Sequence, residues 1–131
     1  MSVLMAEQRN FGPYSKPPTL IYRHVITNTG NAYNPNTGVF TAPVRGVYHF
    51  SVFVYGVGHA SIGAGVSLYK NEERVVVAYS HQPSKVVSSS NGASLLLEVG
   101  DVVYVKLWPK AWVHCSSAHE TTFSGHLLFL M

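Results

Sequence analysis

Charged side chains are scarce in this sequence. Only 11% of its 131 residues are Asp, Glu, Lys or Arg, whereas about 25% is usual in soluble domains. Apolar residues make up 47%, so the chain does not have the low hydrophobicity and high net charge of a disordered protein. Because few charges are available to solvate the surface, part of that surface is expected to be covered.

Long apolar runs, cysteine pairs and clustered charges are also missing. Apolar runs are short, as at residues 75–78 and 102–105, and none approaches the ~20 residues that span a membrane. The single cysteine, Cys115, excludes an internal disulfide. The nine Lys and Arg residues exceed the six Asp and Glu to give a net charge of +3, but they are scattered along the chain. No nucleic-acid partner and no membrane insertion are therefore predicted.

Strand signals dominate what is present, and no helical pattern is found. The longest predicted strand follows Gly46 and alternates between two faces. One face carries Tyr48, Phe50, Val52 and Val54, and the other carries Val47, His49, Ser51, Phe53 and Tyr55. In a sheet with one face in water, a strand should carry polar side chains on that face. The side chains on both faces of this strand are mostly apolar or small, so a partner subunit is expected to cover the second face. About eight to ten short strands predict an all-β sandwich or jelly roll.

The sequence gives little support for a catalytic site or a metal site. Asp101 is the only aspartate and lies in a Gly-Asp turn, so no Ser-His-Asp triad is predicted. His114 and Cys115 are adjacent and would point to opposite faces of an extended chain, which argues against a nucleophile pair. His114, His119 and Glu120 resemble zinc ligands in number, but loop spacing alone does not make them converge. We predict no enzyme, no catalytic residue and no metal ligand.

Four stretches resemble the signature of the complement C1q globular-head domain. They are residues 34–51 (NPNTGVFTAPVRGVYHFS), 68–71 (LYKN), 94–105 (SLLLEVGDVVYV) and 122–129 (TFSGHLLF). The resemblance covers essentially the whole chain and implies a trimeric, ten-stranded jelly-roll sandwich like that of the tumour necrosis factor superfamily. Residues 1–131 would form a single C1q globular domain, and neither a signal peptide nor a collagen-like stalk is expected in this chain.

The resemblance also assigns residues to a trimer interface. It places six residues toward the threefold axis: His49, Ser51, Phe53, Phe123, Gly125 and Leu127. His126 stands where the family pattern usually has Phe, and alternation places it, with Leu128, on the core face. Some relatives bind calcium in the loop before the last strand. That loop, residues 108–122, has no Asp and only Glu120, so neither calcium nor another cofactor is expected.

The function implied by the resemblance is that of a secreted, non-enzymatic recognition head of complement C1q or a C1q-like protein. Its homotrimer would bind immunoglobulin, pentraxins or anionic microbial surfaces such as lipopolysaccharide in innate immunity. Candidate ligand contacts are Arg74, His81, Lys85, Lys110 and Trp112. The alternative is a secreted trimeric signalling ligand for a cell-surface receptor, similar to adiponectin or cerebellin.

Overall fold

The structure is a computed structural model, and it describes residues 1–5, 10–14, 16, 18–115 and 121–131. Strands and turns make up these residues, and no helix is present among them. The strands are β1 (Ser2–Leu4), β2 (Asn10–Phe11), β3 (His24–Thr27), β4 (Tyr33–Asn34), β5 (Val39–Thr41), β6 (Gly46–Val57), β7 (Ala64–Lys70), β8 (Glu73–Ser80), β9 (Val86–Leu97), β10 (Val102–Leu107), β11 (Val113–His114) and β12 (Thr122–Leu130).

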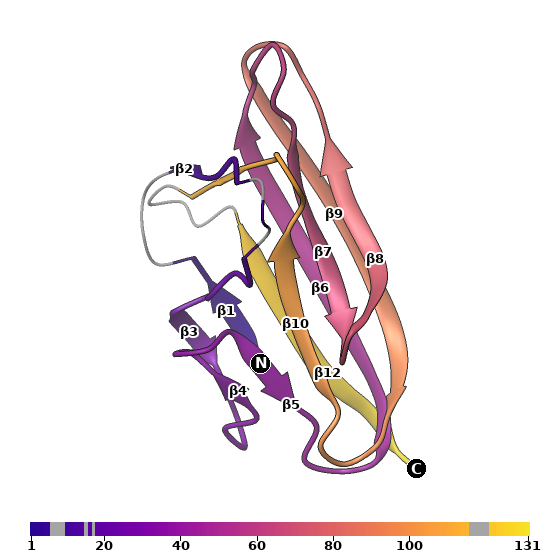
Figure 1. The fold of residues 1–131 in the computed structure, drawn as a ribbon. Coiled ribbons are helices and arrows are strands. Elements are labelled where there is room, and N and C mark those ends of the chain that lie inside the picture. Colours follow the sequence, from indigo (N-terminus) through magenta and orange to yellow (C-terminus); the bar gives the residue numbers. More distant parts are fainter. Residues whose placement is uncertain (6–9, 15, 17, 116–120) are drawn as a thin grey trace.

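Ten of these strands form two five-stranded sheets, as the sequence predicted for a sandwich. The first sheet has the order β3-β1-β12-β6-β9 and the second has the order β4-β5-β10-β7-β8, while β2 and β11 pair separately (Figure 1). Neighbouring strands are antiparallel throughout both sheets. The first and last strands of the chain, β1 and β12, lie side by side in the first sheet.

The core lies between the two sheets and is built around aromatic rings. Phe50 of β6 stacks on Phe123 of β12, with ring centroids 6.0 Å apart, and meets the edge of Phe40 of β5 at 5.1 Å. Leu68 and Val103 of the second sheet are fully buried in the same cluster. These contacts couple the two sheets, because each ring buries a large apolar area that neither sheet could cover alone.

The alternation predicted for β6 is confirmed. Its four core-facing residues are buried, whereas Phe53 on the other face is 51% exposed. The predicted phase of β12 is wrong for Phe123 and Gly125, which face the core and not a neighbouring subunit. Phe123 is 0% exposed and pairs with Val52, which also faces the core. Residues paired across antiparallel strands share a face, so the register with β6 decides the phase.

The same register also changes which face of the sheet the following residues of β12 lie on, compared with the predicted placement. His126 is exposed on the outward face, directly opposite His49, and is not in the core. Leu127 pairs with core-facing Tyr48, although it stays 39% exposed near the end of the sheet. Leu128, expected in the core, is exposed because the register shifts between Leu127 and Phe129.

The connection between β6, which ends at Val57, and β7, which begins at Ala64, is short. The segment predicted as a long loop after residue 108 contains the short strand β11. The described residues contain no apolar helix of membrane-spanning length.

Candidate functional site

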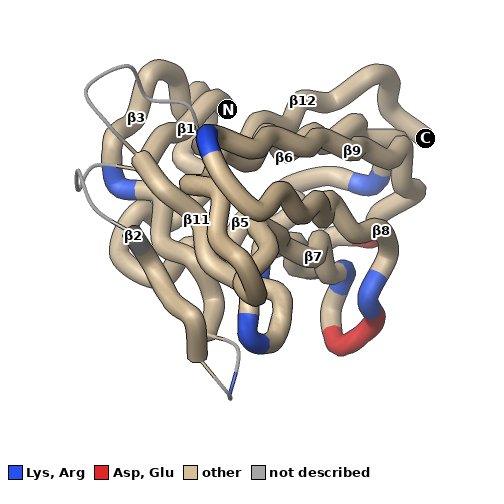
Figure 2. Tube along the Cα trace, turned by 90° about the horizontal axis from the view of Figure 1, so that it is seen from above, with Lys and Arg blue, Asp and Glu red and all other residues tan. Residues whose placement is uncertain are grey.

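The outward face of the first sheet, which we call the uncharged face, is formed by five strands that carry no formally charged side chain. None of the five strands β1, β3, β6, β9 and β12 contains Asp, Glu, Lys or Arg. In Figure 2 the labelled strands of this sheet are tan, and the blue and red segments lie mainly on loops and near the second sheet. A solvated sheet face ordinarily carries polar and charged side chains, so this one is unusual for a surface.

Large apolar side chains are exposed on the strands of this sheet. They are Val25, Ile26, Phe53, Val57, Val86, Leu96, Leu127, Leu128, Phe129 and Leu130. Exposed apolar surface on this scale marks an interaction site on a soluble protein. The structure therefore brings the predicted residues Phe53, His49 and Ser51 together on a face suited to contact with another chain.

A shallow hollow lies beside Phe53 on the same face. It has a volume of about 300 Å³, and its lining residues are Phe53, Val54, Tyr55, Ser88, Ser89 and Ser90. The three serines of β9 are small, so the ring of Phe53 projects next to a depression. A projecting ring beside a depression provides the relief that a close-packed interface needs.

The outward face of the second sheet presents a different surface, which we call the aromatic strip. It consists of Tyr69, Arg74, Tyr79, Tyr104, Lys106 and Trp108. Tyr69 and Tyr104 stack with ring centroids 5.5 Å apart, and Lys106 Nζ lies 4.8 Å from the Tyr69 centroid. Arg74 Cζ lies 5.0 Å from the centre of the Trp108 ring. Both cations are thus placed over aromatic faces, which attract them electrostatically.

Two glycines make room for one end of the aromatic strip. A Cβ at Gly63 would lie 2.3 Å from Tyr79 Oη, and a Cβ at Gly65 would lie 2.6 Å from Tyr79 Cδ2. The Tyr79 ring therefore lies flat against β7, with Trp108 6.3 Å away, centroid to centroid. At the other end, burial raises the pKa of Tyr104, with smaller contributions from Tyr69 and Glu72. The Tyr104 hydroxyl donates a hydrogen bond to Asn71 O at 2.6 Å.

The five predicted ligand contacts fall into two groups. His81, Lys85 and Trp112 surround the β6–β7 loop. His81 Nε2 donates to His59 O at 2.8 Å, Trp112 Nε1 donates to Val57 O at 3.2 Å, and Lys85 O accepts from Gly58 N at 2.6 Å.

The other two predicted contacts, Arg74 and Lys110, lie near Trp108. The Arg74 guanidinium lies over the Trp108 ring. Lys110 lies in a turn closed by a hydrogen bond of 3.1 Å from Ala111 N to Trp108 O. Sequence reasoning missed the remaining members of the aromatic strip. Tyr104, Lys106 and Trp108 recur at every second residue, which is the signal that could have placed them on one face of a strand.

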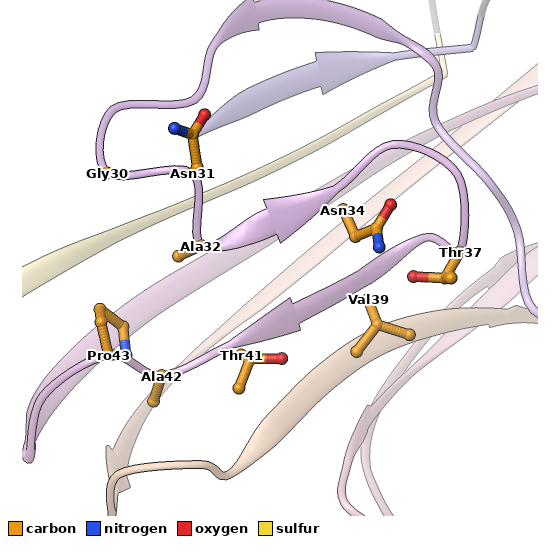
Figure 3. Close-up of a pocket in the computed structure, with 9 residues that line it drawn as sticks. All are labelled: Gly30, Asn31, Ala32, Asn34, Thr37, Val39, Thr41, Ala42 and Pro43. Carbon is orange, nitrogen blue, oxygen red and sulfur yellow. The ribbon is translucent and has the colours of Figure 1, made fainter.

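A larger hollow of about 630 Å³ lies beside the β4–β5 hairpin (Figure 3). Its lining residues are Gly30, Asn31, Ala32, Asn34, Thr37, Val39, Thr41, Ala42 and Pro43. No side chain among them is charged, aromatic or titratable near neutral pH, so the hollow offers no general acid, general base or activated nucleophile.

Of the three residues that resembled zinc ligands in the sequence, the structure describes only His114. His119 and Glu120 lie outside the described residues. His114 packs against Tyr55 with ring centroids 5.8 Å apart. Cys115 is buried, and its thiol donates to Met5 O at 3.3 Å, which is a structural rather than a reactive environment.

Comparison with known proteins agrees with this architecture. Complement C1q tumor necrosis factor-related protein 6 of Rattus norvegicus is 32% identical over 114 residues, covering 84% of this chain and 43% of that relative. The chain therefore spans less than half the length of that relative. The globular domain of zebrafish complement 1qA protein superposes with a TM-score of 0.75 at 24% identity, covering 99% of this chain and 97% of that one.

A second solved structure, from another protein, has a similar fold. Murine APRIL at pH 5.0 superposes with a TM-score of 0.71 at 15% identity, covering 97% of this chain and 96% of that one. These likenesses establish the jelly-roll fold common to C1q and tumour necrosis factor proteins. The family model of the C1q domain matches residues 3–128, and the chain therefore belongs to the C1q domain family.

Proposed function

We propose that the chain is a non-enzymatic recognition head that assembles as a homotrimer and binds its ligand through surfaces outside the interface. The observation that carries this proposal is the uncharged face, with Phe53 and other large apolar side chains exposed on it. Burying such a side chain from full exposure contributes about 1.5–3 kcal/mol, and Phe53, which is 51% exposed in one copy, would contribute roughly half of that on assembly. Several of them on each copy offset the entropy lost on association.

The trimer is tested by sedimentation equilibrium of the purified chain at micromolar concentration. The expected mass is about three times the 14.3 kDa of one chain. A monomer under these conditions would contradict the proposal, because the uncharged face would then be exposed to water without a partner.

For the ligand, we propose immunoglobulin, pentraxins or anionic microbial surfaces, bound in innate immunity by a secreted protein. Support comes from the net charge of +3 and from the cations Arg74 and Lys106 on the aromatic strip. Each head would bind modestly, and linked heads would supply avidity.

Salt dependence distinguishes electrostatic capture from other modes of binding. The Debye length falls from about 10 Å at 0.1 M salt to about 3 Å at 1 M. Capture on immobilised immunoglobulin or lipopolysaccharide should therefore decline over this range, and Arg74→Gln should weaken it at low salt. Arg45→Gln is the matched control, because Arg45 is already paired with Glu98 at 2.8 Å.

A second candidate function is a secreted trimeric signalling ligand for a cell-surface receptor. It is favoured by the relative named a C1q tumor necrosis factor-related protein. Saturable binding to cultured cells, without capture on immunoglobulin or lipopolysaccharide at low salt, would favour this function over the first.

A further inference from the structure

Tyr79 provides a flat, accessible aromatic surface at one end of the aromatic strip. A Cβ at Gly63 or at Gly65 would lie within 2.6 Å of a Tyr79 ring or hydroxyl atom, so the two glycines allow one face of the ring to lie on β7. Tyr79 is nevertheless 47% exposed, and this exposed area belongs mainly to the opposite face of the ring. An aromatic face that is supported from below and open above can stack against a ring of a ligand.

Two cations lie on the same outward face of the second sheet. The Arg74 guanidinium carbon lies 5.0 Å from the centre of the Trp108 ring, and that ring lies 6.3 Å from the Tyr79 ring, centroid to centroid. Lys106 Nζ lies 4.8 Å from the centre of the Tyr69 ring. The cations therefore alternate with aromatic rings along the strip.

Neither Arg74 nor Lys106 has a carboxylate partner in the part of the chain that the structure describes. The ion pairs there are Arg45–Glu98 and Lys70–Asp101. Burial, Tyr69 and Glu72 raise the pKa of Tyr104, so a carboxylate acts on the strip only near its Tyr104 end. The end that carries Arg74 is the more favourable one for an anion.

The backbone beneath the strip is already paired. In the second sheet β10 lies between β5 and β7, and β7 lies between β10 and β8. An extended peptide therefore cannot add to β7 or β10 as a further strand, and a ligand over them meets side chains only. Because the Tyr79 ring lies flat on the sheet, it is not placed to insert into a bilayer. Ring faces and cations are what this surface offers.

We propose that the aromatic strip binds a glycan chain that bears sulfate or phosphate groups, with a sugar ring stacked on Tyr79 and anionic groups at Arg74 and Lys106. The C–H groups on one face of a sugar ring are slightly positive, and the face of an aromatic ring is negative. Arginine and lysine form charge-assisted hydrogen bonds with such anions. The inference rests on the proposed recognition function and narrows its ligand to the glycan itself, bound without a lipid or a protein.

The test is isothermal titration of the folded chain with four polymers of similar length. Short dextran sulfate and phosphorylated dextran carry both sugar rings and anions, and the tighter of the two identifies the preferred anion. Neutral dextran lacks the charge, and poly-L-glutamate lacks the rings. At about 0.1 M salt, each of these two should bind at least about fivefold more weakly than the better anionic dextran, because one stacked ring is worth about that factor or more.

Two variants separate stacking from charge. Tyr79→Leu keeps an apolar side chain against β7 but removes the ring, and it should weaken binding about fivefold at low and at high salt. Arg74→Gln should weaken binding at low salt and make the affinity less dependent on salt. Tyr14→Leu and Arg45→Gln are the matched controls and should keep the parent affinity. Tyr14 is 43% exposed outside the strip, and Arg45→Gln removes the same charge as Arg74→Gln.

The outcomes decide between this site and general attraction of anions. Equal affinity for poly-L-glutamate and the better anionic dextran would overturn the inference, as would an unchanged affinity of Tyr79→Leu or an equal loss in Tyr14→Leu. The comparison of polymers uses the parent chain, so it decides even if Tyr79→Leu does not fold. Capture of immunoglobulin by a chain that binds neither anionic dextran would overturn this inference alone. Glycan binding that is lost in Tyr79→Leu supports it even where immunoglobulin is not captured.

Discussion

At the scale of single residues, Gly125 shows how one missing side chain sets the packing of the core. A Cβ at this position would lie 2.4 Å from Phe50 Cδ1 and 2.5 Å from Phe50 Cε1. The Phe50 ring is fully buried between Phe40 and Phe123, so it has little room to withdraw. The glycine is required by this close approach and not by its backbone conformation.

Gly125→Ala should therefore destabilise the fold. Overpacking a closely packed core costs about 1–3 kcal/mol of unfolding free energy, and urea denaturation would measure the loss. Ser90→Ala on β9 is the matched control, since Ser90 is exposed and such changes alter stability by about 0.5 kcal/mol at most. Equal stability of Gly125→Ala and the parent would show that Phe50 can move aside.

At the scale of elements, hydrogen bonds connect the β7–β8 turn with the β9–β10 turn at one end of the sandwich. Asp101 in the β9–β10 turn accepts from Glu98 N at 2.9 Å and from Asn71 Nδ2 at 3.3 Å. Asn71, in the β7–β8 turn, accepts from Val102 N through Oδ1 at 3.0 Å and has a φ of 53°. Asparagine tolerates this left-handed conformation better than most residues, so the turn sequences fit their conformations.

The carboxylate of Asp101 should make stability depend on pH. The Glu98 N–H and the Asn71 amide, assisted by Lys70, lower the pKa of Asp101 despite some desolvation. A carboxyl whose folded pKa lies below its unfolded value of about 3.9 stabilises the fold above that pH, and the contribution is lost as the pH falls through the folded pKa.

Asp101→Asn should consequently be less stable than the parent at pH 7, because an amide accepts the two hydrogen bonds less well than a carboxylate. The difference should shrink as the pH is lowered below about 4. Thermal melts of both proteins at pH 7 and pH 3 would measure it, with Glu72→Gln of the neighbouring turn as the control. A difference that stays constant between these two pH values would rule out the carboxylate as the cause.

At the scale of the whole molecule, the two sheets present opposite surfaces. The first has exposed apolar side chains without formal charge, and the second has cations placed over aromatic rings. A charge introduced on the first should therefore break the proposed trimer. Phe53→Asp would place one carboxylate per copy in the interface, each with a desolvation cost of several kcal/mol.

Sedimentation of Phe53→Asp should accordingly give the mass of one chain where the parent gives about three times 14.3 kDa. Val99→Asp is the matched control, because Val99 is 68% exposed in the β9–β10 turn and outside the uncharged face. If Phe53→Asp keeps the mass of the parent, the uncharged face is not the interface.

The sequence by itself determined the all-β class, most strand positions and the two-sided character of β6. These features are local: alternation at every second residue and turn residues between strands are visible without knowing which strands pair. His49, Ser51 and Phe53 were placed on the outward face because β6 alternates without interruption.

Only the tertiary structure decided the phase of β12 and the composition of both surfaces. Large apolar residues occupy both faces of β12, so alternation could not tell Phe123 from His126 until pairing with β6 fixed the register. Arg74 likewise reaches Trp108 only because β7 lies between β8 and β10. Strand register and strand order depend on contacts between distant parts of the chain, and a single sequence records the residues but not those contacts.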